Sequence, residues 1–289
     1  MSLNLVQAWQ GARRRLEAAG LAGPVIDARL LVEAAAEATR ADIVTDPHRA
    51  VTPEQEATLD DYLTRRENRE PVSHILGRKG FWKIMLNVTP DVLTPRPDTE
   101  TVVEWVLRDF PEHAPWRVLD LGVGSGAIVL SILAERPAAR GLGVDVSEEA
   151  LAVARDNAAH LGLAGRLALL RGDWTEGLGE DSFDLVVSNP PYIASHVIET
   201  LEPEVRDHEP RVALEGGPDG LLHYRRLAPE ILRVLKPGGR FAVEIGYDQK
   251  AAVEALFREA GAAQVQTLRD LGDRDRVVAG SKNPLETPA

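Results

Sequence analysis

The chain has 289 residues, of which 44% are hydrophobic and 27% are charged, a composition typical of a globular protein with one large and one small domain. Its net charge of −12 argues against direct nucleic acid binding, and its lack of cysteine and seven scattered histidines argue against disulfides and metal sites. No apolar run approaches a membrane span and the opening residues lack the order of a signal peptide, so we expect a cytoplasmic protein without a membrane partner.

Residues 1–72 have the pattern of a small helical bundle. Apolar residues recur at helical spacing within residues 3–20 and again within residues 25–38. A third helical stretch begins with Thr52 as its N-cap and Pro53 as its first helical residue. We expect these helices to form an N-terminal domain of their own.

The pattern changes at residues 73–97, where glycine, asparagine and proline break short apolar runs. We predict a β-hairpin there that links the helical bundle to a second domain, residues 98–289. In this second domain strand patterns alternate with helical ones. The strands that we expect are 117–122, 141–146, 167–173, 183–189 and 240–246, with two more around a charged turn within 263–282.

This alternation predicts an α/β fold, with a doubly wound, mostly parallel, seven-stranded Rossmann-like sheet and helices on both faces. The last two strands are expected to pair as an antiparallel edge. In such sheets ligands bind outside the carboxyl ends of the strands, so the turns that follow the strands are where functional residues are expected.

The first of these turns, "DLGVGSGA", is rich in glycine. Glycine lets the backbone turn sharply and approach a ligand closely, and the helix that follows presents free N–H groups. Asp145 ends the next strand, where a carboxylate can meet ribose hydroxyls. We therefore predict that an adenosine-containing ligand contacts Gly122, Val123, Gly124, Ser125, Gly126 and Asp145.

Two kinds of adenosine-containing ligand fit this turn. "GVGSGA" matches the dinucleotide pattern if Ala127 is accepted at its last position, so a nicotinamide-dependent dehydrogenase is one interpretation. The longer string "DLGVGSG", with Asp120 before the turn, resembles the nucleoside loop of S-adenosylmethionine-dependent methyltransferases. That methyl donor has no pyrophosphate, and its cationic groups suit a nearby acid such as Asp120.

The third turn, "RGDWTEG", contributes Asp173 and Trp174. A carboxylate can accept a hydrogen bond from the exocyclic amine of adenine, and an aromatic ring can cover the base. We therefore predict that both residues contact the cofactor. The alternative for Trp174 is a packing role, since tryptophan is often largely buried.

The fourth turn, "SNPPY", follows an apolar strand that its prolines must end, because proline lacks the N–H that the strand ladder needs. "NPPY" in this place resembles the motif with which methyltransferases hold the nitrogen of planar amines and amides. Asn189 and the backbone carbonyl at Pro190 are acceptors for the two N–H bonds of such a nitrogen, and Tyr192 can stack on it. We predict Asn189, Pro190 and Tyr192 as catalytic residues, Pro191 as a further substrate contact, and Asn189 also as a cofactor contact.

"NPPY" is similar to the motif of enzymes that methylate adenine in DNA, so the motif alone does not select the substrate. Four other stretches do: "PVSHILGRKGFWKIMLNVTPDVLTPRPDTE", "HEPRVALEGGPDGL", "YRRLAPEILRVLKPGG" and "DLGDRDRV". Together with "NPPY" they resemble the protein-glutamine methyltransferases that modify peptide chain release factors. The resemblance extends from the helical N-terminus to Gly280.

This resemblance implies that a methyl group passes from S-adenosyl-L-methionine, leaving S-adenosyl-L-homocysteine, to the glutamine amide in the Gly-Gly-Gln loop of release factors. It implies that the N-terminal domain helps to grip the release factor and that Pro95–Glu100 helps to close the pocket. A related branch methylates a ribosomal-protein glutamine, and a non-catalytic cofactor-binding adaptor is a further alternative. The chain departs from many relatives at His208, where they carry phenylalanine.

Overall fold

The structure is a computed structural model that describes residues 3–284 in two compact units. The first unit contains the chain up to Arg78 together with Glu202–His208, and the second contains Lys79–Leu201 and the residues from Glu209 onward. The sequence analysis did not foresee that Glu202–His208 belongs to the first unit. Residues 1–2 and 285–289, at the ends of the first and last predicted domains, lie outside the described part of the chain.

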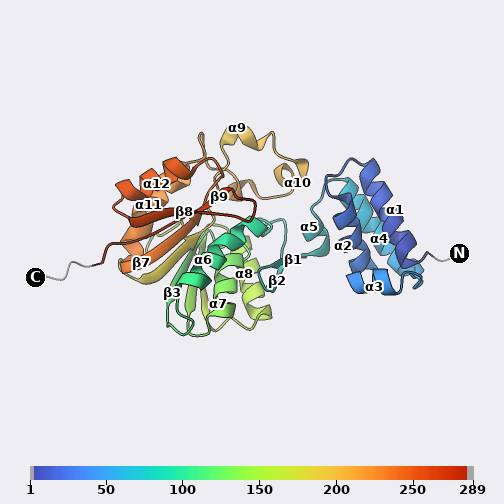
Figure 1. The fold of residues 1–289 in the computed structure, drawn as a ribbon, viewed down its shortest axis with the longest axis horizontal. Helices are drawn as coiled ribbons and strands as arrows, with labels where there is room; N and C mark the ends of the chain where they lie inside the picture. Colours follow the sequence, from blue (N-terminus) through green and yellow to red (C-terminus); the bar gives the residue numbers. More distant parts are fainter. Residues whose placement is uncertain (1–2, 285–289) are drawn as a thin grey trace, which may run out of the picture. The chain divides into compact units, whose positions relative to one another are not determined.

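The first unit is a helical bundle, as the sequence predicted (Figure 1). Its helices are α1 (Leu5–Ala18), α2 (Pro24–Ala35), α3 (Arg40–Thr45), α4 (Pro53–Glu67) and α5 (Val72–Leu76). The predicted N-cap is confirmed, because the Thr52 hydroxyl accepts from the backbone N–H of Gln55 while the Gln55 side chain accepts from that of Thr52. The apolar stripes of α1, α2 and α4 meet in a core that includes Leu5, Leu16, Leu31, Leu59 and Leu63.

The short helix α10 (Pro203–Arg206) joins the first unit through a buried ion-pair cluster. The Arg66 guanidinium lies 2.8 Å from a carboxylate oxygen of Asp27 and 3.0 Å from one of Glu204. Arg69 also contacts Glu204, at 3.4 Å. Because the Arg66 side chain is only 8% exposed, loss of either partner leaves a largely desolvated charge, so these pairs hold the returning segment in the first unit.

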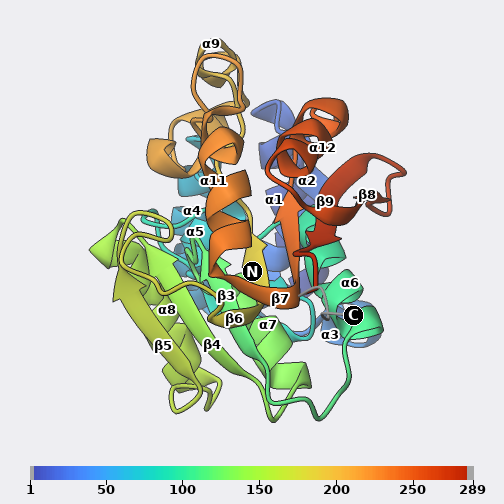
Figure 2. The same cartoon turned by 90° about the vertical axis from the view of Figure 1, so that its left-hand side faces the viewer.

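The second unit is built on a seven-stranded sheet with the order β5-β4-β3-β6-β7-β9-β8, whose strands can be followed in Figure 2. The strands are β3 (Arg117–Leu121), β4 (Arg140–Asp145), β5 (Leu167–Arg171), β6 (Phe183–Ser188), β7 (Leu235–Glu244), β8 (Ala263–Arg269) and β9 (Asp275–Ser281). All neighbours from β5 to β7 pair in parallel, and β9 pairs antiparallel with both β7 and β8. The predicted fold class is therefore confirmed.

Both faces of this sheet are buried. Successive residues of the central strands alternate between two cores: Val118 faces one and Leu119 the other, as do Val187 and Val186. One core packs against α6 (Glu100–Asp109), α7 (Ala127–Glu135) and α8 (Glu148–His160), and the other against α11 (Leu222–Val234) and α12 (Lys250–Glu259). The shorter helices are η1 (Pro97–Thr99), α9 (Ser195–Ile198) and η2 (Arg211–Ala213).

A separate hairpin of β1 (Arg78–Phe81) and β2 (Ile84–Asn87) is anchored to the turn after β3 by one buried side chain. Asn157 of α8 accepts from the backbone N–H of Asn87 at 2.7 Å and donates to its carbonyl at 3.0 Å. The same amide donates to the carbonyl of Ser125 at 2.9 Å. The glycine-rich turn and the hairpin therefore share one anchor.

One strand prediction differs from the structure. The sequence placed the start of the fifth strand at residue 240, because proline and glycine precede it, but β7 begins at Leu235 and accommodates them at an irregularity in its pairing with β6. The sequence also predicted that the last two strands pair as an antiparallel edge, and this is confirmed, because β8 pairs antiparallel with β9 at one end of the sheet. Within residues 3–284, no helix has both the length and the apolar character needed to span a membrane.

A substitution at Gly143 in β4 tests how tightly this strand packs against the glycine-rich turn. A Cβ atom there would lie 2.7 Å from Val123 and 2.9 Å from Leu169. We expect Gly143→Ala to lower the free energy of unfolding of this unit by about 1–3 kcal/mol, because the buried site has no room for a methyl group. Equilibrium urea denaturation measures this, with Gly165→Ala as the control because its added methyl meets nothing within 4 Å. Equal stability of the two variants would contradict the expectation.

Candidate functional site

A cavity of about 240 Å³ lies at the carboxyl ends of the parallel strands of the second unit. Most of the predicted site residues line it: Gly122, Val123, Gly124, Ser125, Asp145, Asp173, Trp174, Asn189 and Pro191. These residues come from four different turns, which meet because parallel strands end at one edge of a sheet. The structure thus brings the glycine-rich turn and the "NPPY" turn to the same cavity.

Three predicted residues do not line the cavity, and each has another structural role. Gly126 begins α7, where a Cβ atom would lie 2.7 Å from Leu130, so this position requires glycine for packing. Pro190 is buried behind the cavity wall. Tyr192 packs against the core on one face of the sheet and donates its hydroxyl to Glu244 at 3.3 Å.

The shape of the glycine-rich turn is fixed by the carboxylate of Asp145, the last residue of β4. The backbone N–H of Gly124 donates to one oxygen of Asp145 at 2.9 Å, and the N–H of Ser147 donates to the other at 3.0 Å. Gly122 and Gly124 have φ angles of +71° and +51°, which side-chain-bearing residues rarely adopt. Asp145 therefore shapes the turn and still has lone pairs for ligand hydroxyls at the cavity wall.

Asp120 supplies an unpaired acceptor to the same cavity. It is 1% exposed; its Oδ2 accepts from the backbone N–H of Val129 at 3.2 Å, and its Oδ1 has no hydrogen-bond partner in the structure. Burial raises the pKa of Asp120 well above its usual range, and the nearby charge of Asp145 adds to this effect. A cationic ligand group in the cavity would supply the missing partner, so the residues present fit an adenosine-containing cationic cofactor.

Asp173 and Trp174 line the cavity but are already engaged. A carboxylate oxygen of Asp173 lies 2.6 Å from the guanidinium of Arg226 on α11. Trp174 has a φ of +55°, and its ring meets that of His223 edge-on with centroids 5.3 Å apart. The sequence analysis treated Asp173 as a free acceptor, whereas the structure leaves it only the lone pairs that Arg226 does not use.

Hydrogen bonds and close packing hold the "NPPY" turn in place. The side-chain amide of Asn189 donates to the Thr99 hydroxyl at 3.3 Å, and the side-chain amide of Gln249 donates to the carbonyl of Tyr192 at 3.0 Å. Close packing adds to this, since a Cβ atom on Gly216 would lie 2.8 Å from the Tyr192 backbone. The turn is therefore held in place by residues from η1, the N-cap of α12 and the segment after α10.

The structure adds a pair that the sequence analysis missed. Arg96 contacts Glu209 at 2.7 Å, and the Glu209 side chain is 1% exposed. Burial raises the pKa of Glu209, while Arg96 and the Thr94 side chain oppose that rise. The pair joins the "PRPDTE" and "HEPR" stretches into one wall, on which Pro95, Arg96, Thr99 and Pro210 line the cavity. No sequence signal pairs these stretches, because over a hundred residues separate them.

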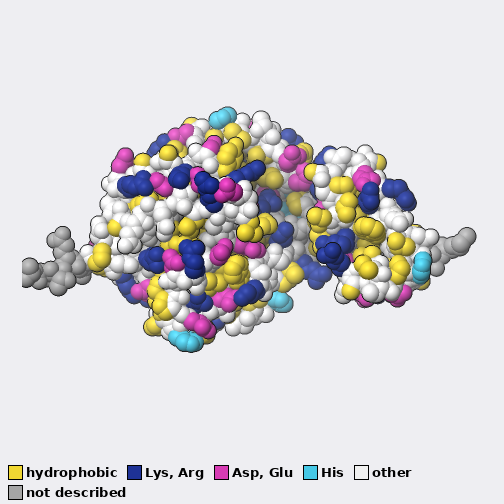
Figure 3. Space-filling model, in the orientation of Figure 1, with side chains coloured by type: hydrophobic (Ala, Val, Ile, Leu, Met, Phe, Trp, Pro, Cys, Tyr) yellow, Lys and Arg dark blue, Asp and Glu magenta, His cyan; other side chains and the backbone are white. Residues whose placement is uncertain are grey.

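His208, the unusual residue before Glu209, belongs to the first unit and does not line the cavity. Among the described residues, no group of three or more His, Asp and Glu side chains is arranged to hold a metal ion. On the face drawn in Figure 3, basic and acidic side chains are interspersed over the second unit. Many of them form surface pairs, such as Arg211 with Glu215.

The fold is an open α/β sheet with a cavity at the carboxyl ends of its parallel strands, and comparisons with known proteins identify its class. Residues 7–77 match the PrmC N-terminal domain, and residues 112–278 match the family described as a methyltransferase domain. A methyltransferase structure from Pyrococcus furiosus superposes with a TM-score of 0.53 at 17% identity, covering 78% of this chain and 99% of that one, which shows the shared fold.

Two relatives identify the family more closely. The release factor glutamine methyltransferase of Caulobacter vibrioides is 69% identical over 289 residues, which is 100% of both chains. The protein of the same name from Rhodospirillum rubrum is 45% identical over 262 residues, which is 91% of this chain and 80% of that one. The chain belongs to the release factor glutamine methyltransferase family.

A substitution of Arg96 tests whether its ion pair with Glu209 stabilises the cavity wall. We expect Arg96→Met to lower the free energy of unfolding by about 1–3 kcal/mol at neutral pH, because Glu209 stays buried without its cation. Loss of Arg96 raises the pKa of Glu209 further. The stability loss is therefore smallest at low pH, where Glu209 is protonated with or without Arg96, and grows as the pH rises.

Urea denaturation of wild type and variant between pH 4 and 8 measures this difference. Arg96→Lys, which keeps the positive charge, is the matched control and should lose less stability at high pH. A stability difference that does not change with pH would show that Arg96 acts through packing and not through its charge.

Proposed function

We propose that this protein transfers a methyl group from S-adenosyl-L-methionine to the side-chain amide nitrogen of the glutamine in the Gly-Gly-Gln loop of peptide chain release factors. The observation that carries the proposal is the meeting of Gly122–Ser125, Asp145 and Asn189 at one cavity. The relatives from Caulobacter vibrioides and Rhodospirillum rubrum are named release factor glutamine methyltransferases, which supports the choice of substrate over nucleobases and ribosomal proteins.

The cavity residues suit the methyl donor. Asp145 can accept from ribose hydroxyls, the Trp174 ring can cover the adenine, and the unpaired Oδ1 of Asp120 can face a cationic group. When bound, the cofactor supplies an electrophilic methyl group on a sulfonium. No metal is needed for this role.

In this proposal Asn189 holds the glutamine amide nitrogen that receives the methyl group. An amide nitrogen is a poor nucleophile because its lone pair is delocalised, so it must be oriented and polarised as it becomes pyramidal. The carbonyl oxygen of Asn189 and a backbone carbonyl at Pro190 are acceptors for its two N–H bonds. Such positioning can contribute a large share of the roughly 7–11 kcal/mol that orientation supplies in favourable cases.

Tyr192 acts as a neutral residue in this scheme. Burial, with the nearby Glu244, raises the pKa of its phenol, so the hydroxyl stays protonated and donates to Glu244. Tyr192 is therefore no general base, and none is needed, because the extra proton of the methylated amide is acidic and can leave to solvent. Its hydrogen bond to Glu244 fixes the end of the "NPPY" turn.

We assign release factor docking to the N-terminal domain, predicted as residues 1–72. We assign the hairpin region 73–97 the role of linker between the two domains. The support is the match of residues 7–77 to the PrmC N-terminal domain. The first unit also contains Glu202–His208, which follows the "NPPY" turn in the chain. The catalytic domain then comprises the remaining residues from 98 onward.

The substrate assignment is tested with labelled cofactor and recombinant release factor. We expect one methyl group per release factor and none on a factor whose Gly-Gly-Gln glutamine is replaced by alanine. Equal labelling of the native and the substituted factor would refute the assignment. Transfer to DNA or to ribosomal protein in the same assay would favour an alternative substrate.

Asn189→Ala tests the role of the "NPPY" turn. We expect turnover to fall by at least about a hundredfold while cofactor affinity stays within about tenfold, because the hydrogen bonds that it removes matter most in the transition state. Steady-state kinetics and calorimetric cofactor binding measure the two effects. Asn283→Ala, on an exposed residue far along the chain, is the matched control. Collapse of cofactor binding would instead make Asn189 chiefly a cofactor ligand.

A further inference from the structure

A buried acid lies directly behind the "NPPY" turn and has no role in the function proposed so far. Glu244 ends β7 and is 1% exposed. Its Oε1 accepts from the Tyr192 hydroxyl at 3.3 Å, and its Oε2 has no partner that meets hydrogen-bond geometry. A buried carboxyl group with an unsatisfied oxygen is costly, so its presence at this position needs an explanation.

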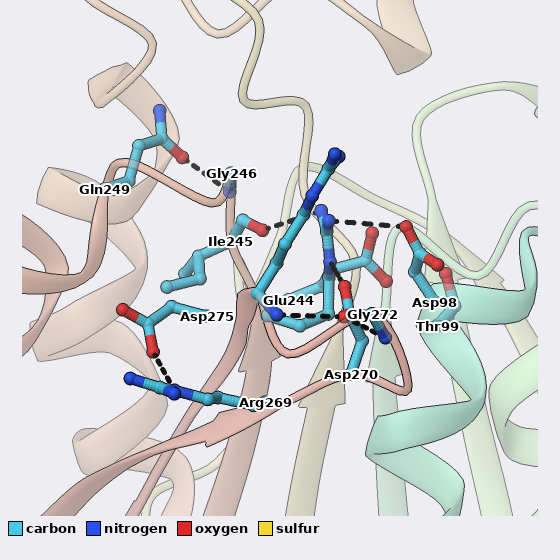
Figure 4. Close-up of polar contacts among 12 residues, drawn as sticks. Asp98, Thr99, Glu244, Ile245, Gly246, Gln249, Arg269, Asp270, Gly272 and Asp275 are labelled. Atoms are coloured by element: carbon cyan, nitrogen blue, oxygen red, sulfur yellow. Dashed lines mark hydrogen bonds and ion pairs between the residues drawn. The ribbon is translucent and has the colours of Figure 1, made fainter.

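The nearest cation is committed to other acids. Arg276 of β9 contacts Asp270 at 3.0 Å and Asp98 at 3.3 Å, and donates to the carbonyl of Ile245 at 3.3 Å. These three partners are labelled in Figure 4. Glu244 therefore has no ion pair of its own. Burial raises its pKa to about 7, although Thr99, Arg276 and Tyr192 oppose the rise.

Thr99 connects Glu244 to the other end of the turn. Its hydroxyl oxygen lies 3.3 Å from the side-chain amide nitrogen of Asn189, and its hydroxyl is close enough to lower the pKa of Glu244 by hydrogen bonding. An ionised carboxylate only accepts, and a hydroxyl has one hydrogen to donate. When Thr99 donates to Glu244, its oxygen must accept from the NH₂ group of Asn189, and the Asn189 carbonyl oxygen then points the other way.

We propose that Glu244, as a carboxylate, is a positioning residue that orients both ends of the "NPPY" turn, Tyr192 directly and Asn189 through Thr99. A chain in which Asn189 donates to Thr99 and Thr99 donates to Glu244 selects one of the two orientations of the Asn189 amide. That orientation presents the carbonyl oxygen to the N–H of the substrate glutamine. The inference rests on the proposed function for its catalytic consequence, but the contacts of Asn189 with Thr99 and of Tyr192 with Glu244 exist without substrate.

When Glu244 is protonated, one orientation of the Asn189 side-chain amide is no longer selected. A protonated carboxyl group can donate to Thr99, which then has no need to accept from the Asn189 NH₂ group. The ionised form is therefore the active one, and activity should rise with pH around the Glu244 pKa of about 7. The other titratable or charged groups around Glu244 and its two partners are Tyr192, Tyr224, Arg96, Asp98, Asp270 and Arg276.

The kinetic test compares Glu244→Gln with wild type between pH 5.5 and 9. We expect kcat to fall by about tenfold to a hundredfold, with cofactor affinity and the KM for release factor changed far less, because an amide of equal size can donate as well as accept. The rise of activity near pH 7 should disappear in the variant. Glu254→Gln, which alters another carboxylate bound to a threonine hydroxyl, is the matched control and should behave as wild type.

Thr99 variants test whether Glu244 acts through the donor chain. Thr99→Val removes the hydroxyl at constant shape and should lower kcat, while Thr99→Ser keeps the hydroxyl and should restore it. The double variant with Glu244→Gln should lose less than the two single losses combined, because both changes break one chain. Fully additive losses would overturn the coupling.

A measurement without catalysis separates this inference from the proposed function. The side-chain amide resonances of Asn189, assigned by their loss in Asn189→Ala, should shift in the free protein with an apparent pKa near that of Glu244, about 7. The shift should be absent in Glu244→Gln. Asn189 resonances that do not respond to pH would overturn the inference even if release factor is methylated. A normal titration without methylation of release factor would instead overturn the proposed function.

Discussion

The parallel pairing of β6 with β3 on one side and β7 on the other is the constraint on which the site depends. Leu121 lies opposite Ser188, and Ser188 lies opposite Val243, so the three strands end at the same level. The glycine-rich turn and the "NPPY" turn directly follow β3 and β6, and Glu244 is the last residue of β7. A shift of one residue in either pairing would turn every side chain of β6 to the opposite face and separate the two turns.

Three buried carboxylic acids surround the cavity region, and each has an oxygen without a hydrogen-bond partner: Asp120, Glu209 and Glu244. Burial raises the pKa of each of them. Such groups oppose folding, and apolar side chains of similar size would be more stable in their place. Their concentration at one edge of the sheet is what a ligand site requires, because unsatisfied acceptors bind cations and donors more strongly than solvated ones do.

The walls of the cavity come from segments that are far apart in the chain. The wall that contains Arg96 and Glu209 joins the stretch before α6 to the stretch after α10, and Asn157 ties the hairpin to the glycine-rich turn. Between the "NPPY" turn and Glu209 the chain contributes Glu202–His208 to the first unit, where Arg66 binds Glu204. The "NPPY" turn is thus followed in sequence by a segment that belongs to the helical unit.

The sequence by itself determined the class of fold and the central chemistry, because strand and helix periodicity, glycine spacing and the "NPPY" string are local patterns. It could not reveal that Asp173 is paired with Arg226, that Gly126 serves packing, that Arg96 meets Glu209 or that Tyr192 donates to Glu244. Each of these facts depends on a partner distant in the chain or on burial. Only the tertiary structure decides them, since pairing and desolvation arise when separate strands and turns meet at one edge of the sheet.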